Sequence, residues 1–591
     1  MKPRPAIALR VRYLNSMEEI SMELALQEQF ANSKIVPGYE IRIEPETMLP
    51  MPDGTRLHTV IYRPDVPEAV PAVLTRTCYP ELDGMNRVRA EAYARRGIAF
   101  VVQHCRGTGG SGGVWEPNIN ERADGKATID WLCAREWVKN AGVLGCSYSA
   151  MTGYTIADIL PDKVKTMYLT HYGVFRHTSA YRDGLFRHDV LTSWAMANAG
   201  FPIKADYIET CRFRPHIEVD EKLWGRRVEW YRDWITADSR TDSYWQYGFW
   251  HMLREIPKKI NIPIFIGEGW YDHHLGSAIE TWQALSDDCR ENSTLFIGAW
   301  DHLFRPKLDG HVGVNFDNFD DLRALNWFCD ILRDGKPPAG RVRVYIIGDD
   351  SWNESNKLEN ETRGVKIFHI GAKDASGSYT LTDNVRDDGF DDGFFEYAYN
   401  PQNPVPSHGA ESMLFSEDGQ GSLLQPAPNY RADIVSCMSD PLVDPVTISG
   451  KIIAQLIVST DVEDTAFVVK IMEVFPDGRT VNIRTGVTTL GFRNNTDTRI
   501  TYQPNSKVKI SIETWDIAWK LQKGSRLRVD ITSSDFPQYS AHANYIGCWS
   551  MQEKTRTAKQ RVYYGSNNDS YISLPVLTWD KAGKKEYGVS L

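Results

Sequence analysis

The chain contains 591 residues, of which 42% are hydrophobic, and its formal net charge is −10. This length exceeds what one hydrophobic core can organise and predicts roughly two to four domains. The acidic balance argues against a nucleic-acid partner, and no stretch is long and apolar enough to cross a bilayer. Because the first residues show no export signal and the nine cysteines show no framework spacing, we expect a cytoplasmic protein with reduced thiols.

An N-terminal lead-in at residues 1–38 precedes a segment in which strand-like and helix-like stretches alternate. Continuous apolar runs predict buried strands, and the helical spacing between them predicts helices that cover the sheet. This alternation favours a parallel sheet with helices on both faces. The expected strands lie at residues 70–75 and 98–103, and the expected helices lie at residues 87–96 and 126–134.

A short motif, Gly145-Cys146-Ser147-Tyr148-Ser149, follows the end of an apolar strand. The pattern Gly-x-Ser-x-small is typical of a nucleophile elbow, a sharp strand-to-helix turn that holds a serine in strained backbone geometry. Its small residues let the chain turn without a steric clash. Because so short a pattern also arises by chance, the assignment of Ser147 as a nucleophile depends on finding its partners elsewhere.

Residues 175–251 interrupt the alternation and are rich in tryptophan and tyrosine at helical spacing. Such a stripe is usually helix core, but an insertion after the elbow would form a cap over a pocket. Beyond residue 340, short strands separated by turn signals predict a two-sheet sandwich of the jelly-roll type. The expected domains are therefore a catalytic α/β domain at residues 39–174 and 252–340, a helical cap at residues 175–251 and a jelly-roll at residues 341–591.

Two later strand ends carry the partners that a nucleophilic serine requires. Asp272 follows a strand expected at residues 264–267, and His302 follows one expected at residues 294–298. The chain order serine, acid, histidine is that of an α/β sheet with a nucleophile elbow. His302 would take the proton of Ser147 and later give it to the leaving group, and Asp272 would fix the tautomer of His302. The alternatives are Glu268 and Asp301 for the acid, and His273 and His274 for the base.

The anionic tetrahedral intermediate of such a reaction also needs hydrogen-bond donors. One is expected to be the backbone N–H of Tyr148, which directly follows the nucleophile. Tyr79 comes just after the strand expected at residues 70–75, and its hydroxyl would supply a second donor unless Tyr79 is only a packing aromatic. We expect no metal and no cofactor, because no histidine pair has ligand spacing on one helix.

Longer motifs resemble those of a known family. They are Met51-Pro52-Asp53-Gly54, the glycine-rich run at residues 106–113, Gly145-Cys146-Ser147-Tyr148, Gly269-Trp270-Tyr271-Asp272, Trp300-Asp301-His302, Phe475-Pro476-Asp477-Gly478-Arg479 and Ser533-Ser534-Asp535-Phe536-Pro537. From about residue 45 onward, the chain resembles the cocaine esterase and X-prolyl dipeptidyl-peptidase family of α/β-hydrolases. The resemblance implies an α/β-hydrolase domain with an inserted helical cap, followed by a C-terminal jelly-roll β-sandwich. It also implies an oxyanion tyrosine at Tyr79 and a triad of Ser147, Asp272 and His302.

The predicted function is hydrolysis of carboxylic esters of small acyl or aromatic acids through an acyl-enzyme on Ser147, with a small-molecule ester or amide as the partner. The first alternative is an amide-cleaving relative, namely an X-prolyl dipeptidyl peptidase, an α-amino-acid ester hydrolase or a glutaryl-type acylase. The second alternative is a catalytically silent binding protein. Candidate substrate contacts are Asp183, Arg187 and Trp270. Their mixed charge leaves open whether an ammonium group or a carboxylate is recognised, and the sequence is also compatible with a homo-oligomer.

Overall fold

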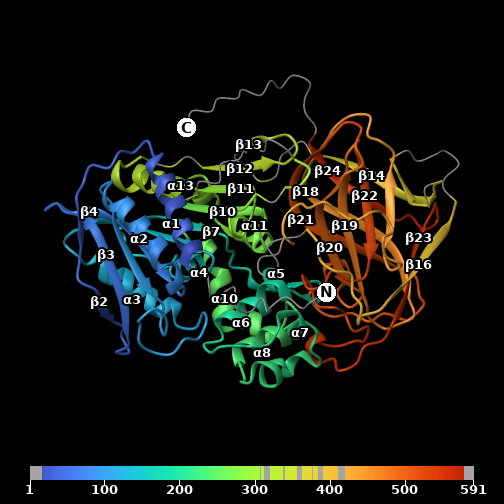
Figure 1. Cartoon of the computed structure of the whole chain (residues 1–591), viewed down its shortest axis with the longest axis horizontal. Coiled ribbons are helices and arrows are strands. Elements are labelled where there is room, and N and C mark those ends of the chain that lie inside the picture. The colour runs from blue at the N-terminus through green and yellow to red at the C-terminus, as the bar shows by residue number, and fades with distance from the viewer. Residues whose placement is uncertain are drawn as a thin grey trace.

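The computed structural model describes residues 16–577, apart from residues 307, 312–319, 337, 339, 356–357, 359–362, 376, 384–390, 410 and 412–418. Two large β-sheets dominate the molecule, and a group of helices lies below and between them in Figure 1. Among the described residues, no helix combines the length and the apolar character that crossing a membrane requires.

The first sheet is parallel through its centre. Its strands are β1 (Ile41–Ile43), β2 (Thr47–Pro50), β3 (Arg56–Pro64), β4 (Val70–Thr77), β5 (Ala99–His104), β6 (Val138–Cys146), β7 (Val164–Thr170), β10 (Ile264–Tyr271), β11 (Thr294–Asp301), β12 (Arg341–Ile346) and β13 (Ser351–Ser355). They lie side by side in the order β1-β3-β5-β4-β6-β7-β10-β11-β12-β13, with β2 beside β3. The strands from β5 to β12 pair in parallel, whereas β3 and β13 pair antiparallel to their inner neighbours.

Helices cover both faces of this sheet. They are α1 (Ser16–Ala31), α2 (Asp83–Ala94), α3 (Glu121–Cys133), α4 (Tyr148–Tyr154), α11 (Leu275–Ala284), α12 (Asp287–Arg290) and α13 (Asp320–Phe328). Successive strand residues point to opposite faces. Val73 and Phe100 therefore pack in one apolar cluster with α1, α2 and α13, whereas Leu74 and Val101 pack in another with α3, α4 and α11. This two-sided burial confirms the α/β fold class that the alternating sequence pattern predicted.

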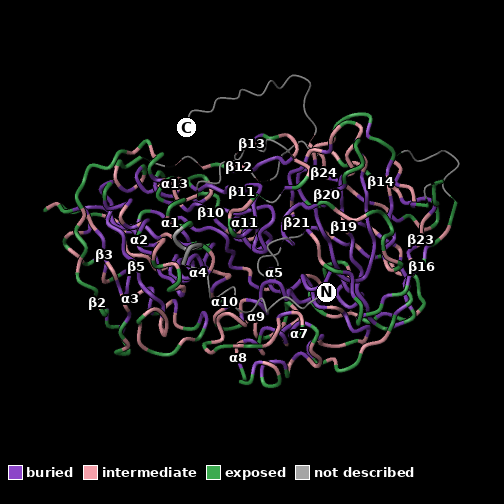
Figure 2. Tube along the Cα trace, viewed as in Figure 1, coloured by how far each residue is buried: buried purple, intermediate pink, exposed green. Residues whose placement is uncertain are grey.

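A helical segment is inserted between β7 and β10, which are neighbours in the sheet. Its helices are α5 (Arg176–Ala180), α6 (Ser193–Asn198), α7 (Tyr207–Arg212), α8 (Glu229–Thr236), α9 (Ser243–Gln246) and α10 (Gly248–Glu255), and a short hairpin of β8 (Tyr181–Arg182) and β9 (Leu185–Phe186) follows α5. Its aromatic residues form mostly core, since Trp234 and Trp245 are almost completely buried. Figure 2 shows this segment with a buried interior and an exposed lower rim.

The second sheet lies on the right of Figure 1 and is mainly antiparallel. Its strands are β14 (Arg363–Lys373), β15 (Tyr379–Thr382), β16 (Gly393–Tyr399), β17 (Val435–Ser439), β18 (Val446–Thr460), β19 (Ala466–Val474), β20 (Thr480–Thr489), β21 (Val508–Leu521), β22 (Arg526–Thr532), β23 (Ala558–Tyr564) and β24 (Tyr571–Leu577). Apolar residues of β18, β19 and β21 are fully buried in this domain, among them Leu456, Val469 and Ile512. The chain therefore ends in a β-rich domain, as its short strands and turn signals predicted.

The first sheet extends past residue 340, where the sequence analysis placed the start of the sandwich. β12 pairs in parallel with β11, and β13 pairs antiparallel with β12, so residues 341–355 belong to the first sheet. The predicted boundary is corrected accordingly. A parallel strand that continues into an antiparallel edge strand has the same local pattern as a pair of sandwich strands, so the sequence could not separate the two.

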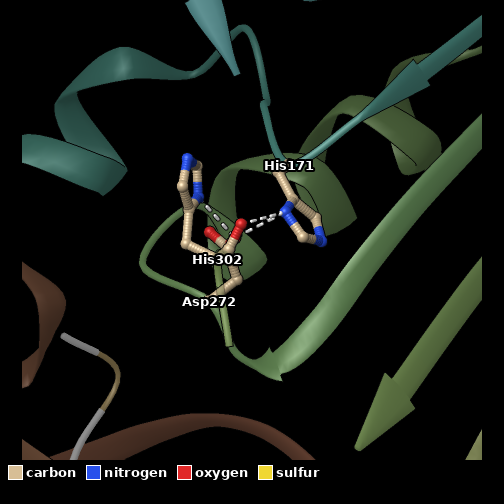
Figure 3. A group of neighbouring side chains, drawn as sticks. All are labelled: His171, Asp272 and His302. Atoms are coloured by element: carbon tan, nitrogen blue, oxygen red, sulfur yellow. Dashed lines mark hydrogen bonds and ion pairs between the residues drawn. The ribbon is translucent and has the colours of Figure 1, made fainter. Parts of the chain in front are cut away.

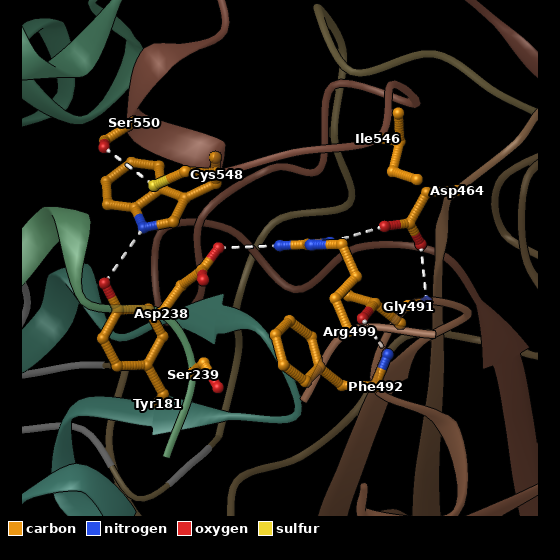
Figure 4. Close-up of polar contacts among 12 residues, drawn as sticks. Tyr181, Asp238, Ser239, Asp464, Gly491, Phe492, Arg499, Ile546, Cys548 and Ser550 are labelled. Carbon is orange, nitrogen blue, oxygen red and sulfur yellow. Dashed lines mark hydrogen bonds and ion pairs between the residues drawn. The ribbon is translucent and has the colours of Figure 1, made fainter. Parts of the chain in front are cut away.

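Polar contacts connect the inserted helical segment to the β-rich domain (Figure 4). The guanidinium of Arg499 lies 2.7 Å from a carboxylate oxygen of Asp238 in the helical segment and 2.7 Å from one of Asp464 in the β-rich domain. The indole N–H of Trp549 donates to the hydroxyl of Tyr181 at 3.3 Å. All three links are at least partly buried, so the helical segment contacts the β-rich domain through polar groups that are shielded from solvent.

Candidate active site

Ser147 lies at the turn between β6 and α4, with φ of +57° and ψ of −126°. Residues other than glycine rarely adopt a positive φ, so the turn stores backbone strain at this serine. Gly145 makes the turn possible, because a Cβ at that position would lie 2.3 Å from the backbone oxygen of Ser149. The local geometry is that of a nucleophile elbow, which holds the serine hydroxyl clear of the strand.

His302 and Asp272 follow the ends of β11 and β10 and lie next to Ser147. The Nε2 atom of His302 is 3.0 Å from Oγ of Ser147, and its Nδ1 atom is 2.7 Å from Oδ2 of Asp272. β6, β7, β10 and β11 are parallel neighbours, so their carboxyl ends meet at one edge of the sheet. This strand order brings together three side chains that lie far apart in the sequence.

The charge state of Asp272 fixes the proton on His302. Full burial alone would raise the pKa of Asp272, but the neighbouring histidines, with His302 first among them, outweigh burial and hold this pKa well below its usual value. The backbone N–H of His274 also donates to Asp272, at 2.6 Å. An ionised Asp272 only accepts hydrogen bonds, so His302 carries its proton on Nδ1 and turns the lone pair of Nε2 toward Ser147.

The alternative acids and bases are placed differently. Asp301 accepts hydrogen bonds from its own turn and from Nε of Arg305 at 2.9 Å. Glu268 is fully buried, and burial together with the charge of Asp272 raises the pKa of its carboxyl well above its usual value. His273 stacks on His302 with ring centroids 4.3 Å apart, and Nδ1 of His274 lies 2.9 Å from the hydroxyl of Ser179. Asp272 and His302 are therefore the pair with the geometry of a triad.

His171 also belongs to this site, and the sequence analysis did not find it (Figure 3). It directly follows β7, is fully buried, and its Nδ1 atom lies 2.8 Å from the backbone oxygen of His302 and 3.5 Å from Oδ2 of Asp272. Its Nε2 atom accepts a hydrogen bond from the indole of Trp300 at 3.3 Å. Burial lowers the pKa of His171 to about 4, so the ring is neutral and donates from Nδ1. The sequence signal that could have pointed to His171 is a polar residue directly after a strand of the predicted parallel sheet.

His171, Asp272 and His302 also form a group whose ligand atoms lie close enough to hold a metal ion. The donor set fits such an ion poorly. Both ring nitrogens of His171 and both of His302 already take part in hydrogen bonds. Each ring donates its Nδ1 proton, His171 to the backbone oxygen of His302 and His302 to Asp272, and a metal ion would have to displace these protons. The hydrogen-bond pattern therefore favours a proton-transfer site.

Two groups next to Ser147 can donate hydrogen bonds to an oxyanion. The hydroxyl of Tyr79 accepts a hydrogen bond from Nε1 of Trp194 at 3.1 Å, and burial raises the pKa of Tyr79 well above its usual value, so it remains protonated. The backbone N–H of Tyr148 is the first of α4 and has no partner within the helix. The side chain of Tyr148 is held by a different contact, because its hydroxyl donates to Glu121 at 3.0 Å.

A cavity opens beside Ser147. Its lining combines aromatic rings with a few polar groups from the sheet edge and from the helical segment, namely Tyr79, Asn118, Ser147, Tyr148, Tyr172, Arg176, Val190, Trp194, Trp234, His273 and His274. The insertion after β7 thus contributes to the walls of this cavity, in the manner of a cap. Such a lining suits a small ligand with an apolar part and a reacting polar group.

The three candidate substrate contacts do not line this cavity. Arg187 is fully buried, pairs with Asp189 at 3.0 Å and donates to the backbone oxygen of Glu411. Asp183 lies in the turn of the β8–β9 hairpin, where its backbone oxygen accepts from Thr489 at 2.9 Å. The indole of Trp270 donates to the backbone oxygen of Tyr345 at 2.7 Å. The structure therefore places all three in contacts within the protein, and their role in substrate binding remains a prediction.

Comparison with known families identifies the class of protein. The family model of the X-Pro dipeptidyl-peptidase (S15 family) matches residues 53–304, and the model of the X-Pro dipeptidyl-peptidase C-terminal non-catalytic domain matches residues 336–573. The chain therefore carries an X-Pro dipeptidyl-peptidase (S15 family) domain, followed by a domain that matches the C-terminal non-catalytic domain of such peptidases. The resemblance that the sequence motifs predicted is confirmed.

Individual relatives span almost the whole chain. The chain is 26% identical to a cocaine esterase of a Rhodococcus species, over 90% of this chain and 98% of that protein. Among solved structures, an α-amino acid ester hydrolase matches with a TM-score of 0.77 and 22% identity, over 91% of this chain and 97% of that one. An aminopeptidase from a marine sediment archaeon, Thaumarchaeota archaeon, matches with a TM-score of 0.75 and 20% identity, over 92% and 98%. At these identities the two solved structures show a shared fold.

Proposed function

We propose that this protein hydrolyses carboxylic esters of small acyl or aromatic acids through an acyl-enzyme on Ser147. The observation that carries the proposal is the continuous hydrogen-bonded arrangement of Ser147, His302 and Asp272, with contacts of 3.0 and 2.7 Å. The aromatic walls of the cavity suit an acyl or aryl group, and the similarity to a cocaine esterase supports ester cleavage.

The proposed reaction follows from the proton positions. Nε2 of His302 accepts the proton of Ser147 as Oγ attacks the ester carbonyl, and the resulting imidazolium is stabilised by ionised Asp272. When the tetrahedral intermediate collapses, His302 gives that proton to the departing alcohol and the acyl group stays on Oγ. A water molecule then loses a proton to Nε2, attacks the acyl carbon and releases the acid, and His302 returns the proton to Ser147.

The negative oxygen of each intermediate would be held by the hydroxyl of Tyr79 and the backbone N–H of Tyr148. The hydrogen bond from Trp194 orients the phenol, because it occupies an acceptor position of the oxygen and leaves its proton free to point into the cavity. Both donors are in place before the reaction begins, so they stabilise charge as it develops and need no reorganisation.

Replacing the phenol tests this assignment. Tyr79→Phe should lower kcat for p-nitrophenyl butyrate by about tenfold to a thousandfold and leave KM little changed, because the lost donor acts in the transition state. The matched control is Tyr93→Phe, which removes a buried hydroxyl from the opposite face of the sheet. Steady-state kinetics of both variants measure the difference, and an unchanged kcat in Tyr79→Phe would show that the oxyanion is bound elsewhere.

A comparison of substrates tests the preference for esters over amides. We expect kcat/KM for p-nitrophenyl butyrate to exceed that for a Gly-Pro p-nitroanilide by several orders of magnitude. Esters are intrinsically more reactive than anilides, and the proposed preference adds to that difference. An anilide kcat/KM equal to that of the ester would contradict the proposal and favour the peptidase alternative.

A further inference from the structure

Arg176 is the only residue with a permanent charge among the described residues that line the cavity of Ser147. It is the first residue of α5 and exposes only 9% of its surface. His273 and His274 share the lining, but burial lowers the pKa of each well below its usual value, so both are neutral. The cavity therefore carries one buried positive charge and no carboxylate on its described walls.

The guanidinium of Arg176 has no anionic partner within the described part of the chain. No carboxylate oxygen lies within 4.0 Å of it, and none of its nitrogens makes a hydrogen bond to the described residues. Two fully buried arginines differ from it, since Arg187 pairs with Asp189 and Arg484 pairs with Glu411 at 2.8 Å. Buried arginines are almost always paired, because desolvating an unpaired charge is costly.

The one described contact of the Arg176 guanidinium is with an aromatic ring, so its hydrogen-bond donors have no partner among the described residues. The guanidinium carbon lies 5.2 Å from the ring centroid of Trp234, which is itself almost fully buried. A cation–π contact draws on the charge of the group and does not use up its N–H donors. A guanidinium with free donors can bind a carboxylate through two parallel hydrogen bonds.

We propose that Arg176 binds a carboxylate on the substrate, so that the enzyme acts on esters that carry an acidic group. The inference rests on the proposed ester hydrolysis and adds the substrate class. The carboxylate would belong either to the acyl part or to the alcohol part of the ester, because Arg176 and Ser147 line the same cavity. The proposal also explains why the walls hold no acid, since a carboxylate there would repel such a substrate.

Binding to an inactive protein tests the proposal without catalysis. In Ser147→Ala, calorimetry should detect the monomethyl ester of glutaric acid binding at least tenfold more tightly than methyl pentanoate. Adding Arg176→Gln should reduce that preference about tenfold to a hundredfold, which is the range for one charge-assisted pair. Arg176→Lys should restore part of it, because lysine keeps the charge but lacks the planar fork. Equal binding of both esters to Ser147→Ala would overturn the acyl-side form of the proposal.

Kinetics distinguish the two positions of the carboxylate. One pair of substrates is mono-p-nitrophenyl glutarate and p-nitrophenyl pentanoate, and the other is 4-butanoyloxybenzoate and phenyl butyrate. In at least one pair, the acid should have the higher kcat/KM relative to its reactivity in water, and Arg176→Gln should lower that ratio at least tenfold. The control is Arg254→Gln, because Arg254 lines only a neighbouring hollow, and it should leave the ratio unchanged.

Two outcomes would contradict the role of Arg176. One is that wild-type enzyme prefers neither acid, a result that does not depend on how any variant folds. The other is that Arg176→Gln and Arg254→Gln change the ratio equally. Either result leaves the proposed function standing as long as hydrolysis of neutral esters still requires Ser147, so failure of the substrate class and failure of the mechanism are separable.

Discussion

Ser147→Ala should lower kcat for p-nitrophenyl butyrate by about a hundred-thousandfold to a millionfold. The variant removes the atom that would form the acyl-enzyme, while the cavity and the oxyanion donors remain. Knock-outs of the nucleophile in other triad hydrolases cost about this much, and the residual rate comes from binding and the oxyanion hole. Steady-state kinetics on purified protein measure the loss.

Ser149→Ala is the matched control for this experiment. Ser149 lies two residues further along in α4, is buried, and its side chain makes no hydrogen bond to the described residues. Its replacement should keep kcat within about threefold of wild type, as expected for a small change without a lost partner. If Ser147→Ala retained a rate similar to that of Ser149→Ala, the hydrolysis would have to proceed without a covalent intermediate at residue 147.

Asp272→Asn should lower kcat about ten-thousandfold without loss of the fold. An asparagine amide can donate to Nδ1 of His302, which places the ring proton on Nε2, and a protonated Nε2 cannot accept a proton from Ser147. The substitution also removes the negative charge that stabilises the imidazolium. The size of kcat and its pH dependence measure how far proton transfer from Ser147 to His302 is lost. Circular dichroism confirms that the protein remains folded.

Glu268→Gln provides a control of the same kind within β10, the strand that Asp272 follows. Burial and the charge of Asp272 raise the pKa of Glu268 well above its usual value, so its carboxyl is neutral and a glutamine amide is nearly isosteric with it. Activity should therefore stay close to that of wild type. Equal losses in Asp272→Asn and Glu268→Gln would mean that the two carboxyl groups act together, which would contradict the separate role given to Asp272.

The parallel sheet and the convergence on Ser147 could be predicted because they depend on local patterns. Apolar runs that alternate with helical spacing define a parallel sheet, and a strand end is where a parallel sheet presents its functional groups. Asp272 and His302 directly follow such runs, so their positions were readable without knowing the strand order. The strand order then determines how close they come to Ser147.

The contacts of Arg187 could not be predicted, because its partner is remote in the sequence. Arg187 donates to the backbone oxygen of Glu411, 224 positions away, and stacks on Trp515 at 5.0 Å. A charged residue in an inserted segment looks the same in the sequence whether it faces a cavity or another domain. Arg176 illustrates the converse, since only the structure shows that it is buried and has no described anionic partner.

His171 was missed for a different reason. It carries a positive φ of 53° directly after β7, a position with no recognised motif, and its contacts with His302 and Asp272 depend on β7 lying beside β10. The boundary near residue 340 was likewise decided by pairing, because β12 and β13 look like sandwich strands until their partners are known. In both cases long-range strand pairing supplied the information that local sequence lacks.

The central claim is that the hydroxyl of Ser147 is the activated nucleophile of this protein. The most direct measurement is peptide mass spectrometry after incubation of the wild-type protein with a fluorophosphonate. We predict a single adduct on the peptide that contains Ser147, formed with loss of ester hydrolysis and absent from both Ser147→Ala and protein unfolded beforehand. An adduct on another residue, or an unmodified Ser147 in folded protein that hydrolyses esters, would contradict the account.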